Sequence, residues 1–174
     1  GVVLVFHDVT EQRRLDREMR WRASHDLLTG LLNRGEFDRR LQQVLQRSRE
    51  EGTRHALLYL DLDQFKLIND ACGHPTGDRL LLQIGQLLGD CVRPGDTLAR
   101  LGGDEFGVLL ERCGVHQAQR VAQLICERME EFRFVHDCRR FRVGASIGLV
   151  PLDARWRQAD AVMQAADSAC YVAK

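Results

Sequence analysis

Apolar residues recur every three or four positions in four segments of the chain, and this spacing predicts amphipathic helices. The segments lie at residues 35–51, 80–91, 121–132 and 159–170. Short apolar runs predict strands at residues 56–62, 97–101, 106–110 and 141–149. Helices and strands that alternate around a central hairpin favour an α+β fold, in which helices cover a mixed central β-sheet.

The first 24 residues have a different pattern. Residues 1–10 form an apolar run that ends in Asp8-Val9-Thr10, which predicts a strand followed by a helix start, because Asp and Thr side chains cap helices. Residues 11–24 are highly charged, as in a solvated or coiled-coil-like helix. We therefore expect a strand at 1–10, a helical linker at 11–24 and one domain at 25–174.

Composition narrows the function classes. The 174 residues are 44% hydrophobic, enough for one folded domain with a short appendage. Lys and Arg together number 25, as do Asp and Glu, so no net charge attracts nucleic acid or a membrane surface. No apolar run approaches the roughly 20 residues that cross a bilayer. The six scattered cysteines predict buried free thiols in a reducing, cytoplasmic location.

Two adjacent carboxylates, Asp104 and Glu105, follow Gly102-Gly103 between two predicted strands. Gly-Gly at this place predicts a tight hairpin with a bare backbone that a large ligand can approach. Adjacent carboxylates repel each other unless a cation lies beside them. Oxygen ligands of this kind favour Mg²⁺, with Mn²⁺ as the alternative, together with a phosphate-bearing substrate.

A further acidic position ends the buried strand at residues 56–62. Asp61 and Asp63 face the same side if the strand continues that far, because side chains alternate along a strand. Together with the hairpin carboxylates, Asp61 would hold two metal ions, the arrangement used in nucleotidyl transfer. Lys66 would then neutralise phosphate charge. The alternative for Asp61 and Lys66 is a surface turn with a salt bridge.

These motifs together resemble the GGDEF family of diguanylate cyclases, which join two GTP molecules into cyclic di-GMP. The resemblance covers about residues 25–174 and rests on five motifs in the family's order, at residues 26–34, 61–70, 69–78, 93–96 and 102–106. It implies the palm-like sheet that the family shares with nucleotidyl cyclases.

The resemblance also implies the roles of individual residues. The metal ligands would be Asp61, the carbonyl of Leu62, Asp104 and Glu105. The catalytic residues would be Asp104, Glu105 and Lys66, and whether a carboxylate or the metal alone activates the 3′-hydroxyl stays open. The GTP site would comprise Phe65, Lys66, Asn69, His74, Asp78, Gly102, Gly103 and Lys174.

Within that site, Asn69 and Asp78 would recognise guanine, which offers donors at N1 and N2 and an acceptor at O6. The alternative for Asp78 is a cap on the helix that follows, and His74 has a structural alternative in a His-Pro turn. Arg93 and Asp96 match the family's inhibitory site for cyclic di-GMP, with an exposed salt-bridged turn as the alternative.

The same resemblance concerns the neighbours of this domain. Two chains, each with one Mg-GTP, would meet face to face as a homodimer. Residues 1–24 resemble the last strand of a PAS sensor domain and its signalling linker, with an ordinary strand and helix as the alternative. The family continues past Lys174 with Gly-Arg-Asn and another strand, so we expect the domain to continue, with an EAL phosphodiesterase domain as a candidate neighbour. The expected location is cytoplasmic, either free or as part of a membrane-anchored protein.

Two functional alternatives remain. The first is a catalytically weak GTP-binding module that regulates an EAL domain. The second is a cyclic di-GMP receptor that acts through Arg93 and Asp96 alone. Intact carboxylates favour catalysis over both. We also expect residues 26–34 to form a structural turn tied by Asp26 and Arg34.

Overall fold

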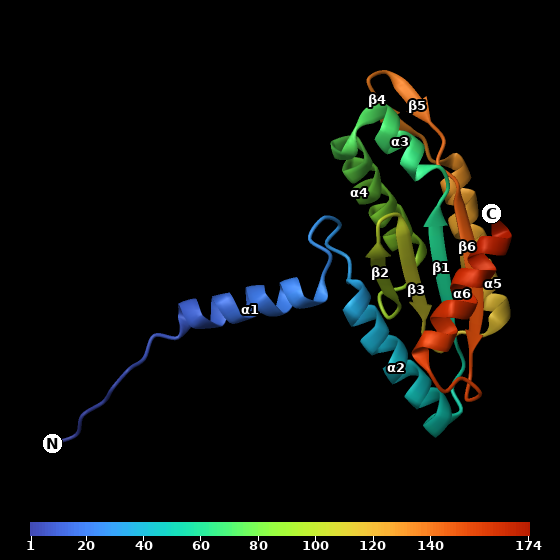
Figure 1. Cartoon of the computed structure of the whole chain (residues 1–174). Coiled ribbons are helices and arrows are strands. Elements are labelled where there is room, and N and C mark those ends of the chain that lie inside the picture. The colour runs from blue at the N-terminus through green and yellow to red at the C-terminus, as the bar shows by residue number, and fades with distance from the viewer.

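The computed structural model describes all 174 residues and shows one four-stranded sheet with helices on both faces (Figure 1). The strands lie in the order β2-β3-β1-β6, and every neighbouring pair is antiparallel. The strands are β1 (His55–Leu62), β2 (Thr97–Gly102), β3 (Glu105–Leu110), β6 (Ala145–Leu152) and a separate hairpin of β4 (Phe134–His136) and β5 (Arg139–Phe141). The predicted α+β class is confirmed.

Six helices complete the fold. They are α1 (Thr10–Ser24), α2 (Arg34–Glu51), α3 (Phe65–Cys72), α4 (His74–Cys91), α5 (Val115–Glu131) and α6 (Ala159–Ala173). The helices α2 and α6 cover one face of the sheet, while α4 and α5 cover the other. Both faces are therefore buried, which explains the continuous apolar run of β1.

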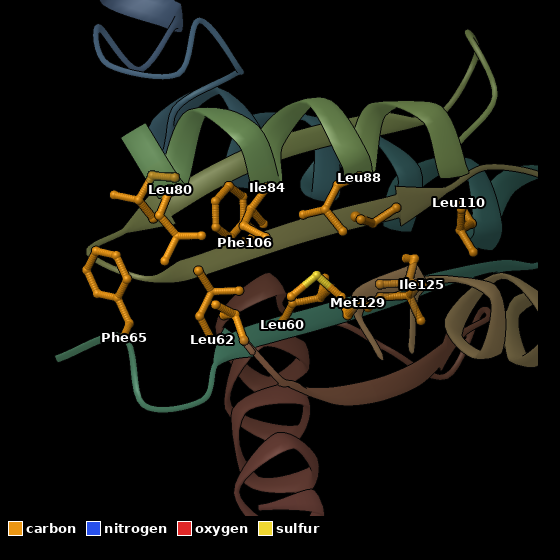
Figure 2. Packing of buried hydrophobic residues seen from close by; sticks show 14 of the residues in the cluster. Leu60, Leu62, Phe65, Leu80, Ile84, Leu88, Phe106, Leu110, Ile125 and Met129 are labelled. Atoms are coloured by element: carbon orange, nitrogen blue, oxygen red, sulfur yellow. The ribbon is translucent and has the colours of Figure 1, made fainter. Parts of the chain in front are cut away.

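The central strand β1 divides the interior into two cores. Leu58, Leu60 and Leu62 point toward α4 and α5, whereas Leu57 and Tyr59 point toward α2 and α6. Figure 2 shows the first core, where side chains from β1 and β3 meet those of α4 and α5. Because β1 is hydrogen-bonded to β3 and to β6, its carboxyl end is held in place and positions the residues that come after it.

Several elements differ from the expected pattern. The helix α3 and the β4–β5 hairpin were not expected, and the strand expected at 141–149 is interrupted, so that β6 begins at Ala145. The helix α4 begins at His74, because Pro75 lies in its first turn, where a missing N–H costs nothing. Asp78 therefore lies inside the helix, and its expected alternative role as a helix cap is wrong.

The amino-terminal region lies outside the domain. The helix predicted at residues 11–24 is present as α1, which has no buried residue and extends away from the sheet (Figure 1); its role as a linker stays a prediction. Residues 1–9 form no strand, contrary to expectation, and they are exposed. A strand requires a neighbouring edge to pair with, and none of the strands lies beside this segment. No helix is both long and apolar enough to cross a bilayer.

Candidate functional site

The carboxylates predicted from the sequence meet at one end of the sheet. Asp61 and Glu105 are direct cross-strand partners on β1 and β3. The backbone N–H of Leu62 donates to the Asp104 carbonyl at 3.1 Å, which joins the hairpin to the end of β1. The structure thus brings the expected metal-site residues together at one end of the sheet.

The turn of the hairpin consists of glycines for a conformational reason. Gly102 has φ +150° and Gly103 has φ +48°, backbone angles that residues other than glycine rarely adopt. No atom lies within 4 Å of where a Cβ of either residue would be, so the space above the turn is open. A ligand can therefore contact this backbone directly.

The carboxylates at this end of the sheet already have one cationic partner. Burial and the negative charge of Asp61 raise the pKa of Asp104. The Lys174 ammonium lies 2.8 Å from Asp61 Oδ1, and this hydrogen bond raises the pKa of the lysine. Asp61 thus already holds one positive charge at the point where the sequence predicts a metal ion.

The donor set fits a hard divalent cation whose shell is shared with a substrate. The side chains do not form a ready cage of three or more metal-binding groups. They offer carboxylate oxygens from Asp61, Asp104 and Glu105, and Leu62 is tied to the same hairpin through its N–H. Mg²⁺ binds proteins through one or two carboxylates and completes its shell with phosphate oxygens and water. The residues present therefore suit Mg²⁺ that arrives with a nucleotide.

The predicted phosphate ligand Lys66 lies on the first turn of α3. Gln64 adopts a left-handed conformation with φ +63°, which turns the chain sharply from β1 into this helix. Phe65 then faces the core, while Lys66 is exposed and makes no ion pair. Lys66 is thus available to a polyphosphate, whereas Lys174 would have to leave Asp61 to reach one.

The residues predicted to bind guanine lie on two packed helices, α3 and α4. Gly73 joins the helices with φ +86°, and its N–H donates to the Asn69 carbonyl at 2.8 Å. His74 and Asp78 lie one turn apart on α4, so they share an exposed face. The Asn69 Oδ1 atom is buried and has no hydrogen-bond partner.

The turn after α1 is connected differently from expectation. Asp26 pairs with Arg100 at 3.1 Å, whereas Arg34 approaches Asp38 at 3.9 Å, so the expected Asp26–Arg34 tie is wrong. Burial acts to raise the pKa of Asp26, but hydrogen bonds from Thr29 and the charge of Arg100 outweigh it and lower this pKa. A long-range partner replaced the nearby one because Arg100 points out of β2 toward the turn.

Arg100 and Tyr59 are site residues that sequence patterns did not identify. The Arg100 guanidinium also donates to the Gly103 carbonyl, through Nε at 3.0 Å and Nη2 at 2.8 Å. Tyr59 is 5% exposed and lies two residues before Asp61. Burial is the main cause of the raised pKa of Tyr59, and a hydrogen bond to Glu105 is the second cause. The available signal was the polarity of each residue within an apolar strand.

The predicted inhibitory pair forms a closed turn. Asp96 is 3% exposed at its side chain and accepts hydrogen bonds from the Arg93 backbone N–H and guanidinium, and from the Glu111 N–H. The Arg93 side chain is half exposed, and its pairing with Asp96 raises its pKa. Arg93 is thus presented on the surface, and Asp96 is a structural anchor for it.

Known proteins are similar to this chain in sequence and in fold. A family described as "Diguanylate cyclase, GGDEF domain" matches residues 23–174. The probable diguanylate cyclase DgcE of Escherichia coli K12 is 45% identical over the whole chain, and the cyclic di-GMP phosphodiesterase PdeB of Shewanella oneidensis is 39% identical. The chain spans 16% of DgcE and 20% of PdeB.

A solved structure agrees as well. The coiled coil and GGDEF domain of DgcB from Caulobacter crescentus, in complex with c-di-GMP, superimposes with a TM-score of 0.88 and 28% identity. The match covers 94% of this chain and 87% of that one. Sequence and fold therefore point to the same family.

Proposed function

The chain belongs to the GGDEF family of diguanylate cyclase domains, and from this membership we propose that it condenses two molecules of GTP into cyclic di-GMP and two pyrophosphates. The observation that supports this best is the placement of Asp61 opposite Glu105, with Asp104 beside them and Lys66 free nearby. GGDEF diguanylate cyclases generally need a divalent metal, and the oxygen donors here suit Mg²⁺.

In this proposal the chain's own residues bind, orient and neutralise the substrate. Asp61, Asp104, Glu105 and the Leu62 carbonyl would hold Mg²⁺, which polarises the 3′-hydroxyl and the α-phosphate. A hairpin carboxylate takes the proton of the 3′-hydroxyl. The 3′-oxygen attacks the α-phosphorus, and pyrophosphate leaves. Tyr59 orients Glu105 through its hydroxyl. Lys66 and Lys174 neutralise the phosphates.

Base recognition would come from α3 and α4. We assign guanine binding to Asn69 and Asp78, with Phe65 supporting Asn69 from the core side and His74 beside Asp78. The carboxylate and the amide oxygen accept hydrogen bonds from N1 and N2 of guanine, which adenine does not offer in this arrangement.

Catalysis would require two copies of the chain. Each copy binds one GTP, so the two bonds of the cyclic product form only when two sites face each other. The exposed helix α1 would set how two domains meet, as the linker between this domain at 25–174 and an upstream PAS-like sensor to which residues 1–10 would belong. An exposed Arg93 held by Asp96 would bind the product and inhibit the enzyme. A cytoplasmic location follows from the substrate.

A second candidate function is supported by the likeness to PdeB, which is named a phosphodiesterase. In that case this domain would bind GTP without turnover and control an adjacent EAL domain. The two candidates make different predictions for the hairpin carboxylates, because only turnover requires them to act on the 3′-hydroxyl.

The deciding experiment compares the full-length protein with its Glu105→Gln variant, with GTP and Mg²⁺. Cyclic di-GMP from the native protein and none from the variant, which still binds GTP, would support the cyclase. Glu127→Gln, an exposed substitution on α5, serves as a control that should keep native turnover. Bound GTP with no product from any of the three proteins would favour the regulatory module.

A further inference from the structure

We propose that Gly77 is a positioning residue for guanine recognition, because its bare backbone sets the place of the Asn69 amide. The proposal rests on the proposed function, in which Asn69 contacts the base. Gly77 lies inside α4, is buried and adjoins Asp78, the other predicted base ligand. The three atoms nearest to a Cβ at this position belong to Asn69 and Phe65, so we expect its effect to fall on binding of the base.

The packing at Gly77 leaves no room for a side chain. A Cβ at this position would overlap Asn69 Oδ1, and it would lie 2.9 Å from Asn69 Cγ and 3.2 Å from Phe65 Cζ. The amide of Asn69 therefore lies directly against the backbone of the neighbouring helix. Any larger residue must displace this amide.

Backbone conformation does not explain the glycine. Gly77 has no positive φ, unlike Gly73 at the start of the same helix. A glycine in the interior of a helix disfavours the helix relative to alanine. The close approach of Asn69 is thus the feature of the structure that accounts for glycine at position 77.

The orientation of Asn69 is set by packing instead of by polar partners. Its Oδ1 atom is buried without a hydrogen-bond partner, so no donor in the protein holds the amide in place. The close approach to Gly77 is the contact that fixes it. A free acceptor on the Asn69 amide would match the N–H donors of guanine and would mismatch the acceptor at N1 of adenine.

Replacing Gly77 by alanine would move the site and leave the fold. The atoms that must yield belong to the end of the Asn69 side chain, which can rotate, and to one ring edge. Alanine also favours the helix. We therefore expect Gly77→Ala to fold, to bind GTP about tenfold more weakly, and to lose preference for GTP over ATP.

The test measures nucleotide binding by calorimetry in the full-length protein carrying Glu105→Gln, so that GTP is not consumed. The matched control is Gly89→Ala on the same helix, where no atom lies within 4 Å of a Cβ. We expect weaker GTP binding in Gly77→Ala and unchanged binding in Gly89→Ala. Equal affinities in the two variants would overturn the proposal.

A double-mutant cycle shows whether Gly77 acts through Asn69. Asn69→Ala removes the amide that a Cβ would displace, so adding Gly77→Ala to it should weaken binding no further. An equal loss in both backgrounds would overturn the proposal. If Gly77→Ala alone fails to fold, recovery of folding in the double variant supports it and continued failure overturns it. Because these arms measure binding, a missing cyclic product in the native protein would count against the cyclase alone.

Discussion

The guanidinium of Arg100 binds Asp26 and the Gly103 carbonyl at the same time, at 3.1 Å and 2.8 Å. Asp26 lies in the turn after α1, and Gly103 forms the tip of the β2–β3 hairpin. One planar side chain thus connects the turn after α1 with the loop that carries Asp104. We therefore expect a mechanical coupling between the position of this turn and the geometry of the carboxylates.

Substituting Arg100 by lysine should lower turnover at least tenfold. A lysine carries the charge but lacks the planar fork, so it cannot serve both acceptors. Loss of a charged hydrogen bond in this half-buried place should also cost about 1.5–3 kcal/mol of unfolding free energy. Cyclic di-GMP production and urea unfolding check both effects. Arg155→Lys, which alters an exposed pair with Asp153 at 2.7 Å, is the control and should change neither. Native turnover in Arg100→Lys would contradict the coupling.

Arg93→Ala should abolish inhibition by added cyclic di-GMP and leave the initial rate unchanged. Arg93 is exposed and distant in sequence from the carboxylates, whereas Asp96 is buried and holds two backbone N–H groups. Asp96→Ala should therefore destabilise the protein in addition, which makes Arg93 the cleaner probe. The measurement is the initial rate against product concentration. An inhibition curve that Arg93→Ala leaves in place would assign product binding to another surface.

Acid should destabilise the protein partly through His55. This side chain is 2% exposed, Nδ1 accepts from the Arg112 N–H at 3.0 Å, and Nε2 lies 2.8 Å from Thr53 Oγ1. Burial lowers the pKa of His55 below its ordinary value of 6.5. Below pH 6.5 the unfolded chain therefore binds a proton that the folded chain does not, and stability falls as pH decreases toward the folded pKa.

The measurement is urea unfolding at pH 7 and at pH 5. His55→Asn keeps an acceptor for the Arg112 N–H but cannot titrate, so its stability should fall less than that of the native protein over this range. One proton contributes at most about 1.4 kcal/mol per pH unit. His7→Asn, at an exposed position, should follow the native curve. Parallel pH dependence of native protein and His55→Asn would assign the acid sensitivity to other groups.

Lengthening α1 by two residues should change turnover of the full-length protein. Two residues rotate the catalytic domain about the helix axis by about 200°, and α1 buries no residue against the domain that would absorb the change. Seven added residues rotate it by about 700°, close to two full turns, and should restore most of the activity. Equal rates for both insertions would argue against control through helix phase.

Much of the fold could be predicted because apolar runs mark it. The strand β1 is buried on both faces, so its run from Ala56 to Leu62 is nearly unbroken. Shorter elements carry too few positions to show a period, as in α3 with eight residues. The start of α4 was hidden because Gly73-His74-Pro75 is typical of a turn, although proline is equally accepted in a first helical turn.

Some residues of the candidate site could be predicted from the sequence, and others could not. Asp61, Asp104 and Glu105 could be grouped from the sequence, because each lies at or next to the end of a strand and the hairpin glycines are adjacent. Their roles stay predictions. The partner of Asp26 could not be found, since Arg100 is 74 positions away and local spacing favours Arg34. Likewise, the contact between Gly77 and Asn69 depends on how two helices cross, which no local pattern specifies.

The turn at residues 25–33 also pairs with the outer edge of the sheet at β2. Leu32 forms a parallel bridge with Ala99, and its carbonyl accepts from the Arg100 N–H at 2.9 Å. β2 would otherwise present a free row of hydrogen-bonding groups, which is a template for strand addition and aggregation. Withdrawal of this turn would uncover backbone groups at the β2 edge, so we expect that displacing the turn also raises the tendency of neighbouring molecules to pair there.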